Sequence, residues 1–547
     1  MSIDGQILTA FVPVPAEALT QGPTGYRVRV VDYDATTNTL YQDLDLPSGP
    51  EYNADPYETA PDEVLLADPR FHAQNAYAIV MRTLARFEFA LGRRVPWGCE
   101  GHQLHVSPHA FAEPNAFYSR EDRGLFFGYF RGANSELVFT SLSHDVVAHE
   151  TSHAILDGLR RGYFEPSLPD QTAFHEGFAD VVALLSIFGL SEVVGTLLSG
   201  ESHGSLIDES LLTVESLRKS TITGLATQMG SALSGVRGHA LRRSVALKPN
   251  IDYYSRDPRF REEHARGELI VAAMLNAFLE IWTRRLSRVG TLDGVGKDRS
   301  LVVEEGARAA NHLLTMAIRA IDYCPPIDLS FHDYLSALLT IDREVVPDDH
   351  FGYRSALVGS FNAYGITPSA SADTDDGSWL RCDKDFVYSR THFDSMLRDR
   401  EEVFRFIWEN RDALGIDTNG NVEVQSVRPS MRIAPDGFIL RETIVEYVQR
   451  LRLTAGELRD DFDVKVPSAI PDWGRLKILG GGVIVFDEYG QVKFNIAHGL
   501  LATPGDRARQ TARIKHLFET GYYDEQQQPA SRFALLHMMR AEHEEGK

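Results

Sequence analysis

The sequence predicts an α+β protein with more than one domain, and three observations support this fold class. The 547 residues exceed one typical domain, and a composition of 43% hydrophobic and 24% charged residues is that of a globular protein with ample core. Strand-like alternation is concentrated in residues 1–140, whereas long apolar patterns with helical spacing fill residues 141–366. Strands and helices are mixed again in residues 379–547.

Residues 1–140 are expected to form a β-rich N-terminal lobe. "YRVRVVDYD", from Tyr26, alternates as a strand does, and "HQLHVSPHAF" and "GLFFGYF" are typical of two further strands around a loop. One helix separates them in the chain, because "FHAQNAYAIVMRTLARFEFALG" has helical spacing and closes on Gly92.

Residues 141–366 are predicted to be mainly helical. "SHDVVAHETSHAILDGLRRG" begins with a serine suited to capping and ends at Gly162, and "PDQTAFHEGFADVVALLSIFG" begins at Pro-Asp and ends at Gly189. "EEHARGELIVAAMLNAFLEIWTRRL" is a third strong helical pattern. The small, polar, acidic stretch "TPSASADTDDGS", residues 367–378, is interpreted as a linker.

Residues 379–547 differ from the preceding helical region in their pattern of hydrophobic residues. They are predicted to form an additional α+β C-terminal domain. We expect a helix near 392–413, strands at 422–428 and 436–453, and a hairpin in "LKILGGGVIVFDEYGQVKFNIAH". A last helix is expected from about residue 504.

Charge and cysteine content narrow the classes of function. The formal net charge of -22 argues against nucleic acid and against an anionic membrane surface as partners. Three cysteines without a pairing pattern favour a reducing compartment. The start of the chain lacks the features of a secretory signal, and the central run "VVALLSIFGL" is about half of the ~20 residues that a membrane span needs. We therefore expect a cytoplasmic protein, with export by a route that needs no signal peptide left open.

The segment "HETSH" has the H-E-x-x-H arrangement. On a helix it places His149 and His153 on one face, one turn apart, where a single metal ion can bridge them. Glu150 lies about 100° around the helix, where it can hold a metal-bound water without being a ligand. The pattern predicts one zinc ion per chain, and the alternative is an ordinary amphipathic helix with two partly exposed histidines.

A hydrolytic zinc site needs a third protein ligand. "FHEGFAD" in the next predicted helix offers Glu176, and Asp180 lies on the same face, where it can fix the tautomer of a ligand histidine. His175 is a rival ligand, although it points about 100° away from that face. A solvated helix face is the alternative for both carboxylates, but the apolar "GFADVVALL" around them indicates burial.

Several segments together resemble the thermolysin-type zinc peptidases, or gluzincins, over about residues 26–365. "DVVAHETSH" resembles the zinc helix of that family, and "EGFAD" resembles the Glu-x-x-x-Asp of its third-ligand helix. "NAFY" resembles the edge strand that binds the substrate main chain. "ALRRS" and "EEHARGELIVAAMLNAF" resemble the segments that carry an arginine and a histidine of the site. The resemblance implies a thermolysin-like core and a peptide or protein substrate.

The resemblance also implies a role for each matching residue. It assigns the zinc ligands to His149, His153 and Glu176, the general base to Glu150, the carboxylate behind a ligand to Asp180, the transition-state donor to His264, a second donor to Tyr163, substrate main-chain binding to Asn115 and Ala116, the carbonyl clamp to Arg242 or Arg243, and an apolar substrate pocket to Val146 and Leu241. The structural alternatives are a tyrosine at a helix end, a surface histidine and two solvated arginines.

The chain departs from the family in ways that bear on regulation. "LLSIFGLSEVVG" lacks the carboxylates of the family's paired calcium site, so no double calcium site is expected. The usual signal peptide and inhibitory propeptide are missing from the sequence as it stands. We therefore expect residues 379–547 to restrain activity or recognise the substrate, through self-inhibition or a regulatory partner.

These observations predict a zinc-dependent endopeptidase with Glu150 as its general base. One alternative keeps the zinc and changes the substrate, giving a narrow amide hydrolase or a protease effector or toxin with a single target. A second alternative is a binding protein that kept the peptidase fold without activity.

Overall fold

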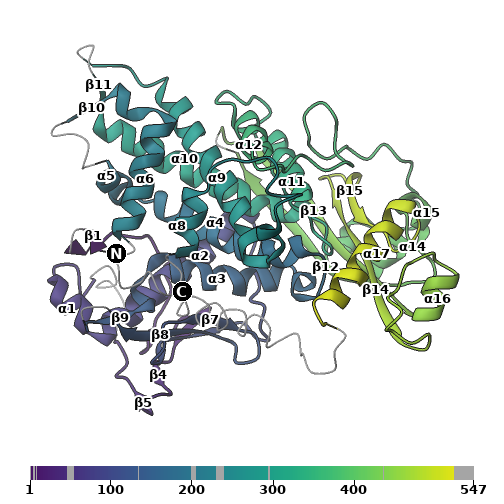
Figure 1. Cartoon of the computed structure of the whole chain (residues 1–547), viewed down its shortest axis with the longest axis horizontal. Helices are drawn as coiled ribbons and strands as arrows, with labels where there is room; N and C mark the ends of the chain where they lie inside the picture. The colour runs from purple at the N-terminus through teal and green to yellow at the C-terminus, as the bar shows by residue number, and fades with distance from the viewer. Residues whose placement is uncertain are drawn as a thin grey trace.

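A computed structural model describes most of the chain (Figure 1). The described residues are 2–3, 6–7, 9–45, 55–132, 135–198, 205–228, 239–292, 296–434 and 436–522, with the side chains of 2–3, 6–7, 222–228 and 239–242 excluded. Helices and strands are mixed along these residues, so the predicted α+β class is confirmed.

The N-terminal lobe contains a five-stranded mixed sheet. Its strands are β3 (Val28–Val30), β6 (Leu104–Phe111), β7 (Ala116–Ser119), β8 (Gly124–Arg131) and β9 (Leu137–Phe139). The order is β3-β6-β8-β7, and β9 also pairs with β8. The first three strands in this order are parallel, whereas β7 and β9 are antiparallel to β8. Within the described part of the chain, β7 therefore lies at an edge of the sheet. Shorter elements are β1 (Ser2–Ile3), β2 (Gln6–Ile7), β4 (Tyr33–Asp34), β5 (Thr39–Leu40) and α1 (Asp62–Ala67).

Helix α2 (Pro69–Leu91) packs on this sheet and ends where the sequence predicts. The Asp68 side chain caps its first turn by accepting a hydrogen bond from the backbone N–H of Arg70. Gly92 ends the helix at φ 65°, a left-handed conformation that costs glycine little. The 23 residues of α2 make this lobe less β-rich than expected.

The second lobe is helical, as predicted. It contains α3 (His144–Leu159), α4 (Pro169–Phe188), α5 (Ser191–Leu197), α6 (Val214–Gln228), α8 (His239–Ala246), α9 (Glu263–Leu286), α10 (Arg299–Ala320), α11 (Phe331–Val345) and α12 (Tyr353–Asn362), with one short strand pair, β10 (Leu206–Asp208) and β11 (Gly296–Asp298). Every residue of α9 from Gly267 to Leu279 is buried, as expected for a helix that is apolar on all sides. In the described part of the chain no single helix is both long and apolar enough to cross a membrane, and α4 with α5 meets that test only as a pair bent by 82°.

Helices α4 and α9 cross at a pair of glycines. A Cβ atom added at Gly177 would lie 2.7 Å from the carbonyl oxygen of Gly267, and one added at Gly267 would lie 2.8 Å from that of Ala173. Real Cβ atoms do not approach so closely, so both positions require glycine for the two backbones to meet. This crossing brings the start of α9 next to the turn of α4 that carries Glu176.

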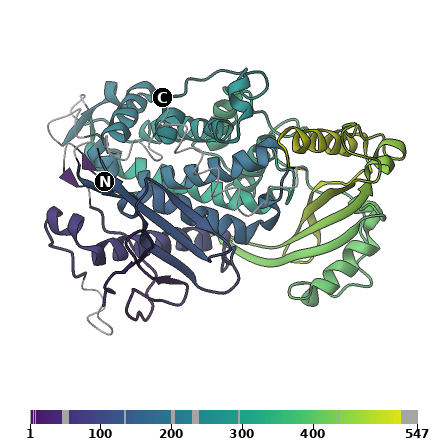
Figure 2. The same ribbon diagram turned by 60° about the horizontal axis from the view of Figure 1, so that its bottom comes forward.

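The C-terminal region is built on a four-stranded antiparallel sheet in the order β12-β13-β14-β15 (Figure 2). The strands are β12 (Asn421–Ile433), β13 (Ile439–Thr454), β14 (Arg475–Phe486) and β15 (Val492–His498), and the helices are α13 (Phe393–Met396), α14 (Arg400–Glu409), α15 (Arg411–Leu414), α16 (Ala455–Asp460) and α17 (Pro504–Glu519). The hairpin and the helix from 504 are thus confirmed. The single helix expected near 392–413 is instead three short helices, α13, α14 and α15.

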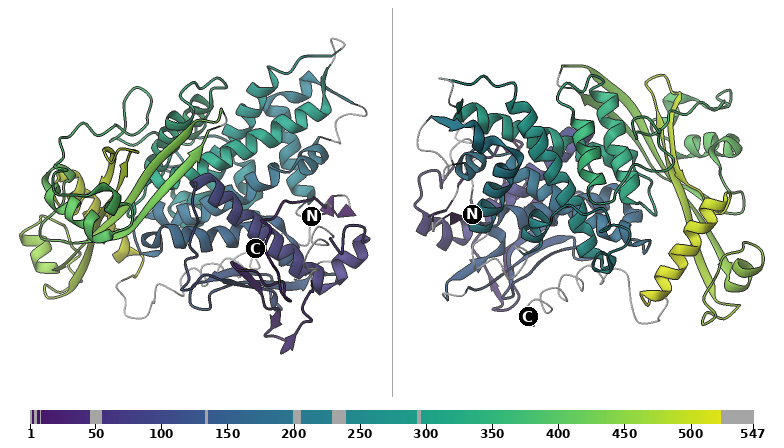
Figure 3. Two further views of the ribbon diagram at one scale, coloured as in Figure 1. Left: turned by 180° about the vertical axis from the view of Figure 1, so that it is seen from behind. Right: turned by 45° about the horizontal axis from the view of Figure 1, so that its top comes forward.

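The two faces of this sheet have different partners because side chains alternate along a strand. In β14, Val483 and Val485 belong to the same hydrophobic core as the helical lobe. Ile484 and Phe486 face the other way and pack with Phe406 of α14. The green strands therefore lie along the side of the helical lobe (Figure 3). One face of the C-terminal sheet therefore shares its core with the helical lobe, and the other face belongs to a core of the C-terminal region itself.

Residues 367–378 are more firmly attached than the predicted linker. The backbone N–H of Ser369 donates to Ser336 Oγ at 2.9 Å, and the backbone N–H of Trp379 donates to Thr340 Oγ1 at 2.7 Å. Both acceptors lie on α11. The indole N–H of Trp379 donates to the carbonyl oxygen of Tyr323 at 2.8 Å. The segment is therefore fastened to the helical lobe at both ends, because its polar side chains and backbone find partners there.

A buried set of charged residues joins the C-terminal sheet to the lobes, and we call it the arginine cluster. Its members are Arg93 after α2, Arg160 after α3, Asp322 after α10, and Arg432, Glu442 and Glu446 from the sheet. Arg93 makes two hydrogen bonds of 2.6 Å to the Asp322 carboxylate, and Arg160 donates to Glu446 at 2.7 Å. Arg432 donates to Glu442 at 2.6 Å and also to Asp322. Burial opposes ionisation, yet Arg93 and Arg432 hold the pKa of Asp322 well below its usual value.

Candidate metal centre

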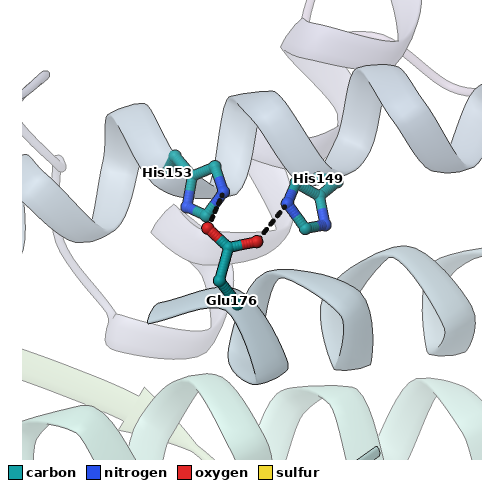
Figure 4. Close-up of side chains that lie close together, drawn as sticks. All are labelled: His149, His153 and Glu176. Atoms are coloured by element: carbon teal, nitrogen blue, oxygen red, sulfur yellow. Dashed lines mark ion pairs between the residues drawn. The ribbon is translucent and has the colours of Figure 1, made fainter. Parts of the chain in front are cut away.

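Two neighbouring helices supply the central residues of the site (Figure 4). His149 and His153 lie one turn apart on α3, and Glu176 faces them from α4. The three residues are between 3% and 4% exposed. Within the described chain, they are the only His, Cys, Asp or Glu group whose possible ligand atoms all lie within 4.8 Å of one another. We call these three residues the metal group.

The distances in the metal group suit a metal ion better than direct hydrogen bonds. His149 Nε2 lies 3.6 Å from Glu176 Oε2, and His153 Nε2 lies 3.5 Å from Glu176 Oε1. Hydrogen bonds between nitrogen and oxygen are usually 2.7–3.2 Å long. Two ligands bound tetrahedrally to zinc at about 2.1 Å are roughly 3.4 Å apart. The donor set, two imidazoles and one carboxylate, is also one that catalytic zinc uses.

Asp180 forms a hydrogen bond with His149, the first histidine of the metal group, at the ring nitrogen that does not face Glu176. Its Oδ1 lies 2.6 Å from His149 Nδ1. A carboxylate accepts at this distance, so Nδ1 carries the proton and Nε2 offers its lone pair toward Glu176. The placement of Asp180 on the Glu176 face of α4 agrees with the sequence-based expectation.

His175 holds the second histidine, and the sequence did not reveal this. His175 Nδ1 lies 2.7 Å from His153 Nδ1, and their rings stack at 4.8 Å. His175 lies outside the metal group, so the rival interpretation of it as a ligand is not favoured. Its signal in the sequence was only its position next to Glu176, because the neighbour that it contacts belongs to another helix.

Glu150 is fully buried on α3, between the two histidines in sequence. Helix geometry places it about 100° around the helix from His149. Its assignment as general base stays a prediction.

His264 lies in the first turn of α9 and is not the surface histidine of the alternative interpretation, since its side chain is 10% exposed. Glu262 accepts from His264 Nδ1 at 2.7 Å and also from the backbone N–H groups of His264 and Ala265. Burial opposes ionisation of Glu262, but these hydrogen bonds, with His264 first among them, lower its pKa to about 2. Glu262 thus both caps the helix and fixes the histidine ring.

The predicted substrate strand lies beside the zinc helix. β7 contacts α3, and Tyr118 of β7 donates to Asp157 of α3 at 2.9 Å. Asn115 is buried, and its Oδ1 accepts from the backbone N–H of Ala116 at 2.8 Å. β7 thus presents an edge of the sheet beside α3, and binding of the substrate main chain by Asn115 and Ala116 stays a prediction.

Tyr163 has a different place from the one expected. It is 1% exposed, its hydroxyl donates to the carbonyl oxygen of Pro325 at 2.9 Å, and its ring meets Phe174 edge-on. Burial raises its pKa well above the usual value. A transition-state donor needs a hydroxyl directed at the substrate, so we correct the assignment of Tyr163 to a core residue at the end of a helix.

The remaining predicted residues are only partly described. Arg243 is half exposed and pairs with Glu268 of α9 at 3.0 Å. The side chains of Leu241 and Arg242 lie outside the described residues. Val146 is buried in the core on α3, one turn before the metal group. The assignment of the carbonyl clamp to Arg242 or Arg243 stays a prediction.

Comparison with known proteins does not assign the chain to a family. No protein-family model matches the sequence, and a search of curated proteins finds no match. The function is therefore inferred from the chemistry and geometry of the site.

Proposed function

We propose that the protein is a zinc-dependent peptidase whose metal is held by His149, His153 and Glu176. The observation that carries this proposal is the convergence of two Nε2 atoms and one carboxylate across gaps of 3.5 and 3.6 Å. The sequence order H-E-x-x-H adds a buried carboxylate, Glu150, between the two histidines. Together these are the parts that metal-assisted hydrolysis of an amide needs.

A bound zinc ion would supply Lewis-acid chemistry, lowering the pKa of water and polarising the substrate carbonyl. Glu150 takes a proton from the attacking water and delivers it to the leaving amine nitrogen. His149 and His153 keep their Nε2 lone pairs toward the ion because Asp180 and His175 engage their Nδ1 atoms.

In this proposal His264 stabilises negative charge on the substrate oxygen. Its Nδ1 is engaged by Glu262, which leaves Nε2 to act as a donor in the protonated ring. The α4–α9 crossing at Gly177 and Gly267 holds α9 close to the helix of Glu176. An extended polypeptide pairing with β7 would lie beside α3, which favours a peptide over a small amide as substrate.

Burial of the site favours a restricted substrate range as the second candidate. The metal group is no more than 4% exposed, and Glu150 is fully buried. A broad endopeptidase needs a cleft that accepts many chains. A protease with one target, or one that opens on contact with it, accounts for the same chemistry in a closed site.

Two variants test the proposal when zinc content and peptide hydrolysis are measured together. Glu176→Ala is expected to lose the one zinc ion that the wild type holds. Glu150→Gln is expected to keep the zinc and lose activity by about 10²–10⁴-fold or more, since only proton transfer is removed. Wild-type protein without zinc, or Glu150→Gln with full activity, would contradict the proposal. Zinc at one per chain with no cleavage of a peptide library would select the single-target candidate.

A further inference from the structure

We propose that Arg82 and Arg86 of α2 form a binding site for a small oxyanion, and that free phosphate is the ligand that fits it best. The two residues lie four positions apart, so their side chains leave the same face of α2 one turn apart. Arg82 is 5% exposed, and Arg86 is partly buried. Neither residue belongs to the metal group, so this inference is independent of the proposed function.

Arg82 differs from the other buried arginines because it has no acceptor among the described residues. Its Nε is enclosed without a hydrogen-bond partner, and no described carboxylate forms an ion pair with it. A buried charge without a partner is unstable. Every other buried arginine in the described ranges donates to a carboxylate or carbonyl oxygen of the protein, namely Arg27, Arg160, Arg285, Arg319, Arg432 and Arg513.

The electrostatics around Arg82 favour a bound anion. Burial, followed by repulsion from Arg86, lowers the pKa of Arg82 to about 10, and burial also lowers the pKa of Arg86. Glu192 in the first turn of α5 acts on Arg82 in the opposite direction. Glu192 is exposed, however, and in the part of the chain that the structure describes it forms no ion pair with either arginine. A bound anion would balance the remaining positive charge.

The start of α3 lies near the arginine pair and supplies no negative charge. Burial, followed by repulsion from Arg82, lowers the pKa of His144, the first residue of α3, to about 3. The His144 ring is therefore neutral at pH 7, and its Nε2 lies 3.1 Å from Ser186 Oγ. Ser186 in turn donates to the carbonyl oxygen of Ala183 at 2.8 Å. The amino end of a helix carries partial positive charge, which adds to the attraction for an anion.

The chemistry of the pair selects a tetrahedral oxyanion. A guanidinium group offers parallel N–H donors that match two oxygens of phosphate, and two such groups match the charge of a dianion. The enclosed Nε of Arg82 leaves little room for a bulky ligand, whereas the partly exposed Arg86 gives an ion access from solvent. These features favour free phosphate over a phosphate ester on a larger molecule.

Binding is tested by titrating inorganic phosphate into the full-length protein, by calorimetry and by thermal melts, with chloride at equal ionic strength as the reference. We expect the wild type to bind about one phosphate per chain and its Tm to rise with phosphate concentration. Arg82→Met should weaken binding at least about tenfold, and Arg82→Lys, which keeps the charge without the fork, should lie between the two. No phosphate binding beyond the effect of chloride would overturn the proposal.

Arg319→Met is the matched control. Arg319 is 6% exposed, and its donors are satisfied by the carbonyl oxygens of Ala90 and Ile433. This variant should bind phosphate as the wild type does. In phosphate-free buffer the two variants should also differ in sign, because Arg82→Met removes an unpaired charge and raises the Tm, whereas Arg319→Met leaves two carbonyl groups unpaired and lowers it. A lower Tm for Arg82→Met would contradict the inference.

Glu176→Ala separates this site from the metal group. That variant keeps both arginines and should bind phosphate as the wild type does, even where it has lost zinc. Loss of phosphate binding in Glu176→Ala would place the ion at the metal and overturn the proposal. Phosphoserine is the second probe, and binding as tight as that of phosphate would overturn the assignment to the free ion.

The more exposed arginine covers the case in which Arg82→Met does not fold. Arg86→Met alters a partly exposed position and should also weaken phosphate binding, by about tenfold. Unchanged affinity in Arg86→Met would contradict a site made by both arginines.

Discussion

The metal group and the arginine cluster are both buried sets of ionisable side chains, but they are arranged differently. In the arginine cluster, carboxylates and guanidinium groups meet at 2.6–2.7 Å, and each carboxylate receives a cationic donor. In the metal group, imidazole and carboxylate atoms stop at 3.5–3.6 Å around a common point. Buried charges are stable only when paired or bound to metal. In the first arrangement protein atoms pair every carboxylate, and the second has the spacing of a cation site.

The comparison also changes the role expected of the C-terminal region. The arginine cluster takes residues from the segments that follow α2, α3 and α10 and from the C-terminal sheet. Arg428 of that sheet donates to the carbonyl oxygen of Leu159, the last residue of the zinc helix, at 2.8 Å. A module that only gated the site would need fewer buried contacts. The shared core favours a structural role for residues 379–522 in holding α3.

Among the changes considered, removal of residues 379–547 should have the largest effect on the stability of the protein. The remaining chain would expose the apolar surface that Val483 and Val485 cover, and it would leave Arg93, Arg160 and Asp322 without the sheet residues that complete the cluster. We expect a truncated protein that aggregates and shows no cooperative melt in circular dichroism. A folded, monomeric fragment with raised peptidase activity would instead support a gate.

Arg432→Leu tests the arginine cluster by one substitution. Arg432 is fully buried and bridges Asp322 and Glu442, so its loss leaves two buried carboxylates close together. We expect the free energy of unfolding to fall by about 3–5 kcal/mol in urea titrations. The control is Arg450→Leu on the same sheet, where an exposed pair with Glu423 should contribute about 0–1 kcal/mol. Similar losses in both variants would remove the distinction between the two pairs.

Gly177→Ala tests the packing that assembles the site. The added methyl group would press on the backbone of Gly267, so α9 must move away from α4 and carry His264 with it. We expect about 1–3 kcal/mol of destabilisation in thermal melts, together with reduced hydrolysis. Gly195→Ala on α5 is the matched control, because its new Cβ would find its nearest atom at 3.9 Å. That variant should gain about 0.5–1 kcal/mol from helix propensity.

The smallest expected change in stability concerns two buried histidines, His72 and His109, whose ring nitrogens are hydrogen-bonded to other protein groups. His109 Nδ1 contacts Asp32 at 2.6 Å, His109 Nε2 contacts His72 Nδ1, and His72 Nε2 contacts the carbonyl oxygen of Leu66 at 3.0 Å. All four ring nitrogens have protein partners, in contrast to the spacing in the metal group. Burial, with repulsion from His109 next, lowers the pKa of His72 to about 4.

This pKa predicts a loss of stability in mild acid. The unfolded chain takes up a proton at His72 near its usual pKa of about 6.5, whereas the folded protein resists until about pH 4. The contribution of His72 is therefore complete above pH 6.5 and lost as the pH falls toward 4, by about 1 kcal/mol between pH 7.5 and 5.5. Urea titrations at both values should show a smaller decrease for His72→Phe than for the wild type. An identical decrease would indicate that His72 is not responsible.

The sequence by itself determined the parts of the site that depend on one helix. His149 and His153 share a face of α3, and Glu176 and Asp180 share a face of α4, because 3.6 residues per turn fix these directions in any helix. Helix ends such as Gly92 were likewise predictable, since a local backbone conformation selects the residue.

Only the tertiary structure decided which groups meet across elements. On a helix, His175 points about 100° away from the face that carries Glu176 and Asp180. Its contact with His153 forms because α3 lies against that other side of α4. Tyr163 was assigned a role from a family spacing, but its side chain is buried in the core. There the carbonyl oxygen of Pro325 accepts a hydrogen bond from its hydroxyl group. The residues of the arginine cluster lie far apart in the chain, and a pairing such as Arg160 with Glu446 depends on how the C-terminal sheet docks. Local spacing defines a direction in space, whereas a contact also requires the position of the partner, and packing of the whole core supplies it.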